Sequence, residues 1–149
     1  MDEWKQLIVA ANMKYASERY PLALSLYQQA LQHALDIFDD KVRGDPDGTI
    51  AAVMVSYFNI ADAYLVLREV DTASDQFDSA FQFLWQILKV EKLSGEVSNA
   101  AVKACGQVNM EWSGCIDKHG GEMTENFIQH YREAKRALNS VVILKSRIH

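Results

Sequence analysis

The chain has little of what marks disordered or fibrous proteins. Its 149 residues include only two prolines and seven glycines, and 49% of them are hydrophobic. This composition is that of an ordinary globular protein. A domain of this length buries roughly 70% of the surface that its unfolded chain exposes. We therefore expect one domain over residues 1–149, with a core that needs no covalent or metal crosslinks.

Cysteine and long apolar runs are also scarce. Cys105 and Cys115 are the two cysteines, and they lie ten residues apart in what reads as one helix. That spacing separates them by about 15 Å, whereas a disulfide requires Cα atoms within about 7 Å. No basic leader with an apolar run starts the chain, and no apolar stretch approaches about 18 residues. We therefore expect a reducing, cytoplasmic setting and no membrane.

Positive charge is the third scarcity. The chain has 15 Lys and Arg residues against 20 Asp and Glu residues, which gives a net charge of −5. No basic cluster forms a stripe. Nucleic acids and anionic membranes both require concentrated positive charge, so neither is an expected partner. The acidic balance still permits a basic protein partner.

The spacings that mark common metal and catalytic sites are missing. The sequence contains no Cys-x-x-Cys, no His-Glu-x-x-His and no Glu-x-x-His pair. The segment 45–48 is a poor calcium loop, because Arg43 and Met54 stand where acidic ligands belong. The cysteines have no evident basic neighbour to activate them. We expect no enzymatic activity, no metal and no cofactor.

Apolar residues at three- and four-residue spacing run through almost the whole chain, and no segment alternates as a half-buried strand does. The predicted class is therefore all-α. Six helices are expected, and short turns join them into three consecutive antiparallel hairpins over about 3–42, 49–92 and 96–148. Within these, the expected helices are about Glu3–Ser17, Pro21–Val42, Thr49–Arg68, a fourth with Asp71 as N-cap, a fifth from residue 96 to His119, and a sixth to residue 148. Gly120 or Gly121 is expected to close the fifth helix in the left-handed conformation.

A local pattern recurs at an offset of fifty residues. Tyr20, Ala23, Tyr27 and Ala30 match Val70, Ala73, Phe77 and Ala80, and Leu7 and Ala11 match Tyr57 and Ala61. Small residues let two helices approach closely, while large residues fill the gaps between neighbouring hairpins. The pattern resembles the tetratricopeptide repeat (TPR), which implies a right-handed superhelix. Ala30, Ala80 and Ala134 are spaced by more than the usual period of about 34 residues, so longer helices than usual are expected.

The resemblance also implies where a partner would bind. In this family the first helix of each hairpin lines a concave groove that receives a peptide or helix. Carried over by position, the lining residues are Ile8, Asn12, Tyr15, Phe58, Asn59, Asp62, Leu65, Val66, Trp112, Ile116 and His119. The implied function is a noncatalytic protein–protein interaction module of an adaptor, chaperone-like or regulatory kind. An alternative is a small apolar-ligand binder in which Phe58, Leu65, Trp112 and Ile116 enclose a cavity.

The last helix has apolar residues on more than one face. A terminal helix of a repeat protein normally turns a polar face outward. The surplus predicts a homodimer seam or a contact with a partner, and a purely structural homodimer is a further alternative. The residues of this seam would be Leu138, Val141, Val142, Leu144 and Ile148. The competing interpretation is that this helix folds back over the stack.

Overall fold

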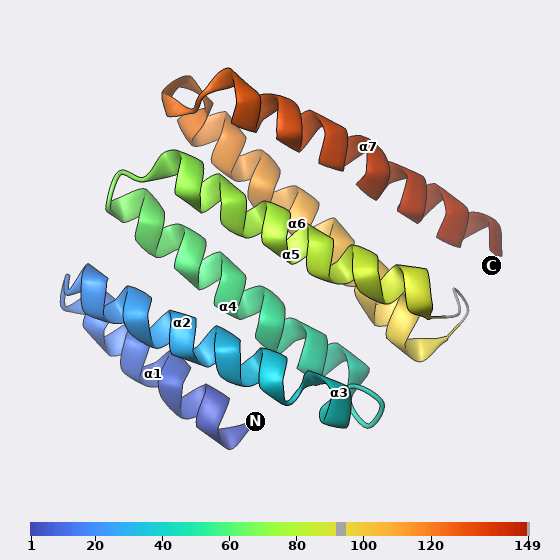
Figure 1. Cartoon of the computed structure of the whole chain (residues 1–149), viewed down its shortest axis with the longest axis horizontal. Helices are drawn as coiled ribbons and strands as arrows, with labels where there is room; N and C mark the ends of the chain where they lie inside the picture. Colours follow the sequence, from blue (N-terminus) through green and yellow to red (C-terminus); the bar gives the residue numbers. More distant parts are fainter. Residues whose placement is uncertain (92–94, 149) are drawn as a thin grey trace.

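The chain is wholly helical in the part that the structure describes, which confirms the predicted class. A computed structural model gives residues 1–91 and 95–148, with side chains described as far as Val141. Figure 1 shows the helices in a row from α1 at one end to α7 at the other. They are α1 (Asp2–Ala16), α2 (Tyr20–Asp36), α3 (Phe38–Lys41), α4 (Pro46–Val66), α5 (Val70–Val90), α6 (Glu96–His119), a 3-10 turn η1 (Gly120–Glu122) and α7 (Glu125–Ile148).

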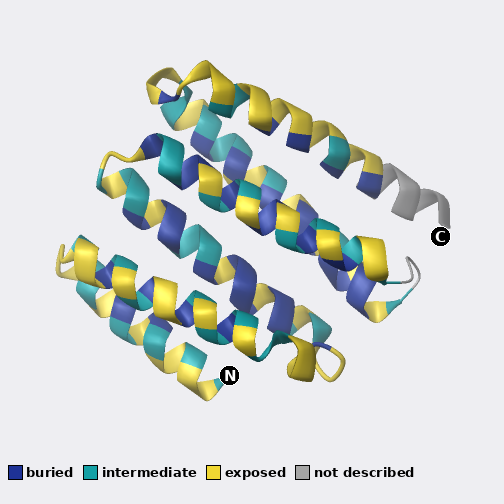
Figure 2. Ribbon diagram, viewed as in Figure 1, coloured by how far each residue is buried: buried dark blue, intermediate teal, exposed yellow. Residues whose placement is uncertain are grey.

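Neighbouring long helices pack side by side. α1 contacts α2, α2 contacts α4, and α6 contacts α4, α5 and α7. Buried residues lie on the helix sides that face these neighbours, and the outer side of α7 is mostly exposed (Figure 2). The buried residues form a small cluster among α1, α2 and α4, and a larger cluster that extends from α2 through α4, α5 and α6 to α7. The larger cluster contains most of the aromatic side chains.

The positions that repeat at an offset of fifty match in burial except at one pair, where Tyr20 is half-buried and Val70 is buried. All the alanines of the pattern are buried, and so are Tyr27 and Phe77, whereas Tyr20 and Tyr57 are half-buried. Small side chains at these points let α1 approach α2 and α4 approach α5 closely. The buried members are Ala11, Ala23, Tyr27 and Ala30, and Ala61, Ala73, Phe77 and Ala80.

The turns after α1 and α4 also match at this offset. Glu18 has φ 61° and Arg68 has φ 65°, so both lie in the left-handed region. The Arg19 N–H donates to the Lys14 carbonyl at 2.8 Å, and the Glu69 N–H donates to the Tyr64 carbonyl at 2.9 Å. These bonds close each helix in the Schellman arrangement. A residue with a side chain costs about 1 to 2 kcal/mol in this conformation.

The second expected helix is wrong in its length. The sequence predicted one helix to Val42, but α2 ends at Asp36 and the four-residue α3 follows. Ile37 has φ −94° and ψ −2°, which turns the chain between them. The structure therefore has seven α-helices in its described part where six were expected.

Three helix ends also differ from expectation. α4 begins at Pro46 rather than Thr49, because the Asp45 carboxylate caps it by accepting the Gly48 N–H at 3.0 Å. α5 begins at Val70, so Asp71 lies in its first turn and not at its N-cap. The glycines after α6 are not left-handed, because the chain continues directly into η1.

α4 is long and apolar enough, by length and composition alone, to cross a membrane. The expectation that no apolar stretch reaches this length was therefore wrong. Half of the apolar window is buried inside the protein, where α4 contacts α2, α5 and α6. Core helices of soluble proteins meet the same criteria, so α4 by itself is weak evidence for a membrane.

Candidate functional site

A hollow of about 250 Å³ opens between α4 and α6. Two of the predicted groove residues, Asp62 and Leu65, contribute its α4 wall. The complete lining is Asp62, Leu65, Phe77, Met110, Glu111, Gly114, Cys115, Lys118 and His119. The hollow thus combines an apolar floor with charged groups from two helices.

The α6 wall follows from helical spacing. Residues three, four and seven positions apart lie on one side of a helix, which places Glu111, Gly114 and Lys118 together. A Cβ atom added at Gly114 would meet no other atom within 4 Å, so the absence of a side chain here leaves open space beside α6. Met110 borders the hollow and is 74% exposed. An apolar group of another molecule therefore has an apolar side chain to contact at the rim.

Asp62 is the electrostatic centre of the site. Burial raises the pKa of its carboxyl group, the charge of Glu111 raises this pKa further, and Lys118 lowers it. Burial also raises the pKa of Tyr15 on α1, with the charge of Asp62 as the next cause. Asp62 is therefore within electrostatic reach of both α1 and α6. We call the surface formed by Tyr15, Asp62, Leu65, Glu111 and Lys118 the Asp62 face.

The asparagines predicted in the groove are in different environments. Asn12 is exposed, and its Oδ1 accepts the Tyr27 hydroxyl at 2.6 Å, which ties α1 to α2. Burial is the main cause that raises the pKa of Tyr27. Asn59 is half-buried on α4. The Asn12 amide group is left to donate to another molecule, because only the carbonyl oxygen is used in the contact with Tyr27.

Trp112 was expected in the groove, and its position in the core corrects that expectation. It is 1% exposed, and its ring lies 5.2 Å from Tyr131 and 6.3 Å from Phe77. Its Nε1 donates to the Ser74 hydroxyl at 3.0 Å, deep in the protein. Phe58 continues the series, 5.9 Å from Phe77. The rings fill the space between α4, α5, α6 and α7.

The same ring packing concerns the alternative function, a small apolar-ligand binder with an enclosed cavity. Phe58, Leu65, Trp112 and Ile116 were expected to surround it, but the aromatic rings pack against one another there. Ile116 is partly buried against the main cluster, and Ile8 is buried in the small one. Val66, by contrast, is 39% exposed on the same side of α4 as Asp62.

The predicted dimer seam is only partly described. Leu138 and Val141 are buried within the chain itself, Leu138 at 2% exposure, so they are not surface residues. The helix packs back onto α6 and α5, which occupies their apolar side chains. Val142, Leu144 and Ile148 lie outside the residues whose side chains the structure describes.

The titratable groups in the hollow do not make an activated nucleophile. Burial raises the pKa of the Cys115 thiol to about 11, and the charge of Asp62 raises it too. At neutral pH such a thiol is ionised in only about one molecule in ten thousand, and the thiolate is the reactive form. His119 pairs with Glu122 at 3.9 Å, within the turn after α6. The Cys115 thiol therefore stays protonated at neutral pH.

Met110, Glu111, Gly114 and Lys118 were missed by the sequence reasoning. The repeat pattern placed Trp112, Ile116 and His119 on the groove side of α6, but of these three only His119 lines the hollow. The available signal was the series Glu111, Gly114 and Lys118, whose polar or absent side chains mark the open side of the helix.

The comparisons with known proteins give one result. A protein family described as "Protein of unknown function (DUF2753)" matches residues 2–149. No curated protein and no solved structure matches the chain.

Proposed function

The chain belongs to the family described as "Protein of unknown function (DUF2753)", and we propose that it is a noncatalytic protein–protein interaction module. Its Asp62 face binds a peptide or helix of another protein. The observation that carries this proposal is the hollow between α4 and α6, which combines an apolar floor with charges from two helices.

The size of the hollow favours a side chain over a drug-sized ligand. Small-molecule pockets typically measure about 300 to 1,000 Å³ and enclose most of the ligand. The space between α4 and α6 is about 250 Å³ and opens to solvent beside exposed Met110. One or two side chains of a peptide fill such a space, with the remaining peptide lying along the Asp62 face.

Exposed apolar groups are concentrated on the same three helices. The described residues expose seven large apolar side chains, and five of them lie on α1, α4 and α6. Contiguous apolar surface rimmed by polar residues is typical of interaction sites. Val55, Asn59, Asp62 and Val66 share one side of α4 by their spacing. The five are Val9, Met13, Val55, Val66 and Met110.

We further propose that the helices form three antiparallel hairpins of a TPR-like right-handed superhelix. The hairpins would be α1–α2, α4–α5 and α6–α7, and the Asp62 face would be the concave side. Support comes from the matching turns at Glu18 and Arg68 and from the alanines buried at an offset of fifty. In such a stack each unit contacts chiefly its neighbours.

A random peptide library displayed on phage tests this function. Peptides selected on the intact protein are then measured by fluorescence anisotropy against Met110→Glu and Leu22→Glu. Both changes place a carboxylate at an exposed apolar residue, but Leu22 lies on α2, which contributes no residue to the Asp62 face. We expect Met110→Glu to weaken binding by about tenfold or more, which corresponds to about 1.4 kcal/mol. Leu22→Glu should bind as the unmodified protein does.

The proposal fails in either of two cases. One is that no peptide is enriched over a blank surface. The other is that the selected peptides bind Met110→Glu with unchanged affinity. Circular dichroism of both variants checks that helicity is intact.

A further inference from the structure

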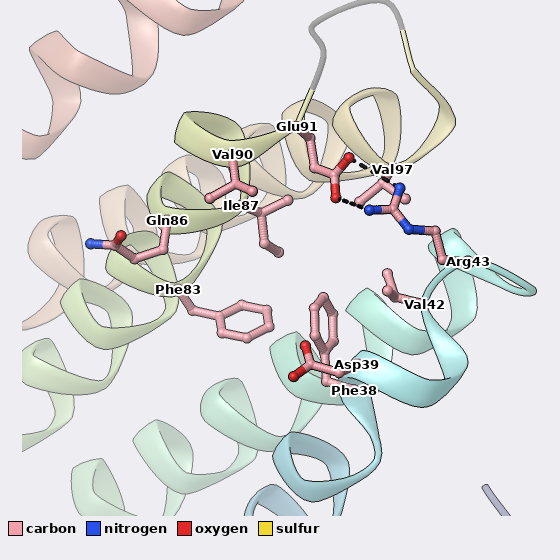
Figure 3. A pocket seen from close by; sticks show the side chains of 10 residues that line it. All are labelled: Phe38, Asp39, Val42, Arg43, Phe83, Gln86, Ile87, Val90, Glu91 and Val97. Atoms are coloured by element: carbon pink, nitrogen blue, oxygen red, sulfur yellow. Dashed lines mark hydrogen bonds and ion pairs between the residues drawn. The ribbon is translucent and has the colours of Figure 1, made fainter.

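A second hollow, of about 480 Å³, lies between α3, the end of α5 and the start of α6 (Figure 3). Its walls are mainly apolar, and its polar groups are few. Phe38 and Phe83 meet edge to face with their ring centroids 4.9 Å apart. The remaining lining is Asp39, Val42, Arg43, Gln86, Ile87, Val90, Glu91 and Val97.

The break after α2 creates this space. If α2 continued as one helix to Val42, its last turn would stay in line with the rest of α2. Instead the chain turns at Ile37, and α3 with the Val42 that follows it brings Phe38 and Val42 to one wall of the hollow. Ile87 and Val90 on α5 form the opposite wall (Figure 3). The pocket is therefore a property of the region where the repeat pattern ends.

One of the two carboxylates in the lining is already neutralised. The Arg43 guanidinium donates two hydrogen bonds to Glu91, of 2.6 and 3.1 Å, in a bidentate pair. Such pairs are strong and geometrically fixed. An anionic ligand would have to displace Glu91 from this arginine, and the displaced carboxylate would repel it.

Asp39 is the other carboxylate. Among the residues that the structure describes, no ion-pair partner lies within 4 Å of it, and it is exposed at the rim. Figure 3 shows its carboxylate beside Phe38, across the hollow from Arg43. The uncompensated charge of the pocket is therefore negative and lies at one side of an apolar space.

We propose that this pocket binds a small amphipathic cation, an apolar or aromatic body that carries a protonated amine. The body contacts Val42, Phe83 and Ile87, and the ammonium group lies toward Asp39. The volume falls within the range of about 300 to 1,000 Å³ typical of small-molecule sites. Aromatic rings in the wall also attract a cation that lies over their faces.

Three matched probes test the charge preference on the intact chain. Phenethylamine, propylbenzene and hydrocinnamate share a phenyl group and a two-carbon spacer, and they end in an ammonium, a methyl and a carboxylate group. Each is titrated into the isotope-labelled protein, and the amide shifts are followed by two-dimensional NMR. Phenethylamine should shift residues 38–43 and 83–91 and bind about 3- to 10-fold more tightly than propylbenzene. Hydrocinnamate should bind most weakly.

Asp39→Asn and Asp40→Asn form the matched pair of variants. Both remove one exposed carboxylate from α3, but only Asp39 lines the hollow. Asp39→Asn should reduce the affinity for phenethylamine to that for propylbenzene, and Asp40→Asn should leave it unchanged. Met110→Glu should also leave it unchanged, which separates this site from the Asp62 face.

Three results would overturn the proposal. The amide shifts could fall outside the two expected segments. Asp39→Asn could bind phenethylamine as tightly as the unmodified chain does. Hydrocinnamate could bind as tightly as phenethylamine, which would show that Arg43 and not Asp39 selects the ligand.

Discussion

The α1–α2 pair and the α4–α5 pair begin alike and end differently. Both have a turn with a left-handed charged residue, and both have buried alanines at equivalent positions. At the far end α2 stops at Asp36 and gives way to α3, whereas α5 continues without a break to Val90. The repeated residues thus specify the turn and the contact between paired helices. The far ends of the two pairs share no repeated residues, so their structures can differ. This difference opens the hollow between α3, α5 and α6.

The two pairs also differ in what surrounds the repeated aromatic residue. Tyr27 lies in the smaller cluster and hydrogen-bonds to Asn12. Phe77 lies in the larger cluster, between the rings of Phe58 and Trp112. The same position therefore joins two helices in the first pair and links successive helices in the second.

Removing the Phe77 ring should have the largest effect on this contrast. Phe77→Ala is expected to lower the free energy of unfolding by about 3 to 5 kcal/mol, because it leaves a cavity between two rings. Urea denaturation followed by circular dichroism measures the loss. Tyr27→Ala is the comparison, and it should cost less because the first cluster is smaller. Equal losses would show that the two positions are energetically equivalent.

The cap of α4 gives the next largest effect. α2 and α5 begin without a side-chain cap bond, whereas Asp45 caps α4. A Cβ at Gly48 would collide with the Asp45 carboxylate, so Gly48→Ala should cost about 1 to 2 kcal/mol of stability. Gly106→Ala is the control, since a Cβ there meets no atom within 4 Å. It should stabilise the chain by about 0.5 to 1 kcal/mol, and a loss from it would contradict this reasoning.

The matching turns allow a symmetric test. Glu18→Gly and Arg68→Gly should each raise the thermal stability, by about 1 kcal/mol, because glycine adopts positive φ without steric cost. Glu18→Ala separates backbone strain from the loss of the side chain and should change little. If only one glycine substitution stabilises, the two turns are not equivalent in energy despite their equal geometry.

The smallest effect concerns Asp62, which stands where the first pair has Asn12. Burial raises the pKa of Asp62 above 3.8, so the folded state binds this proton more tightly than the unfolded state. Its contribution to stability is complete below pH 3.8 and is lost as the pH rises through the folded-state pKa. Asp62→Asn should therefore stabilise the chain at neutral pH, by a few tenths of a kcal/mol because the group is partly exposed. Denaturation curves from pH 3 to 7 measure it, and a stability difference independent of pH would contradict it.

Much of the fold could be predicted because close helix contacts require small residues, which can be recognised in the sequence. Ala23, Ala30, Ala73 and Ala80 are small where the helices touch, and the structure buries all four. The break at Ile37 could not be recognised in the sequence, because the apolar spacing continues through it and no glycine or proline marks it. Left-handed conformations were expected at glycines and occur at charged residues instead.

The candidate site was predicted on α4, but on α6 it was missed except at His119, for a related reason. Asp62 and Leu65 lie near the repeated Ala61, whose position fixes the orientation of α4. The third expected hairpin, 96–148, matches the repeat weakly, since Phe127 stands where the pattern has an alanine, so nothing in the pattern fixed the rotation of α6 about its axis. Trp112 was assigned to the surface although a large aromatic residue is also typical of a core.

The helix α6, which forms one wall of the hollow, contains two glycines, so we expect it to be locally less stable than α4, which forms the other wall. Each glycine inside a helix costs about 1 kcal/mol relative to alanine, and neither Gly106 nor Gly114 is compensated by a close contact. α4, which is packed against α2, α5 and α6, has no glycine beyond its first turn. We therefore expect local opening to have a lower free energy in α6 than in α4, so that the backbone amides of α6 exchange with deuterated solvent sooner. A partner that binds in the hollow would slow this exchange. Amide exchange in α6 would therefore report when the partner is bound.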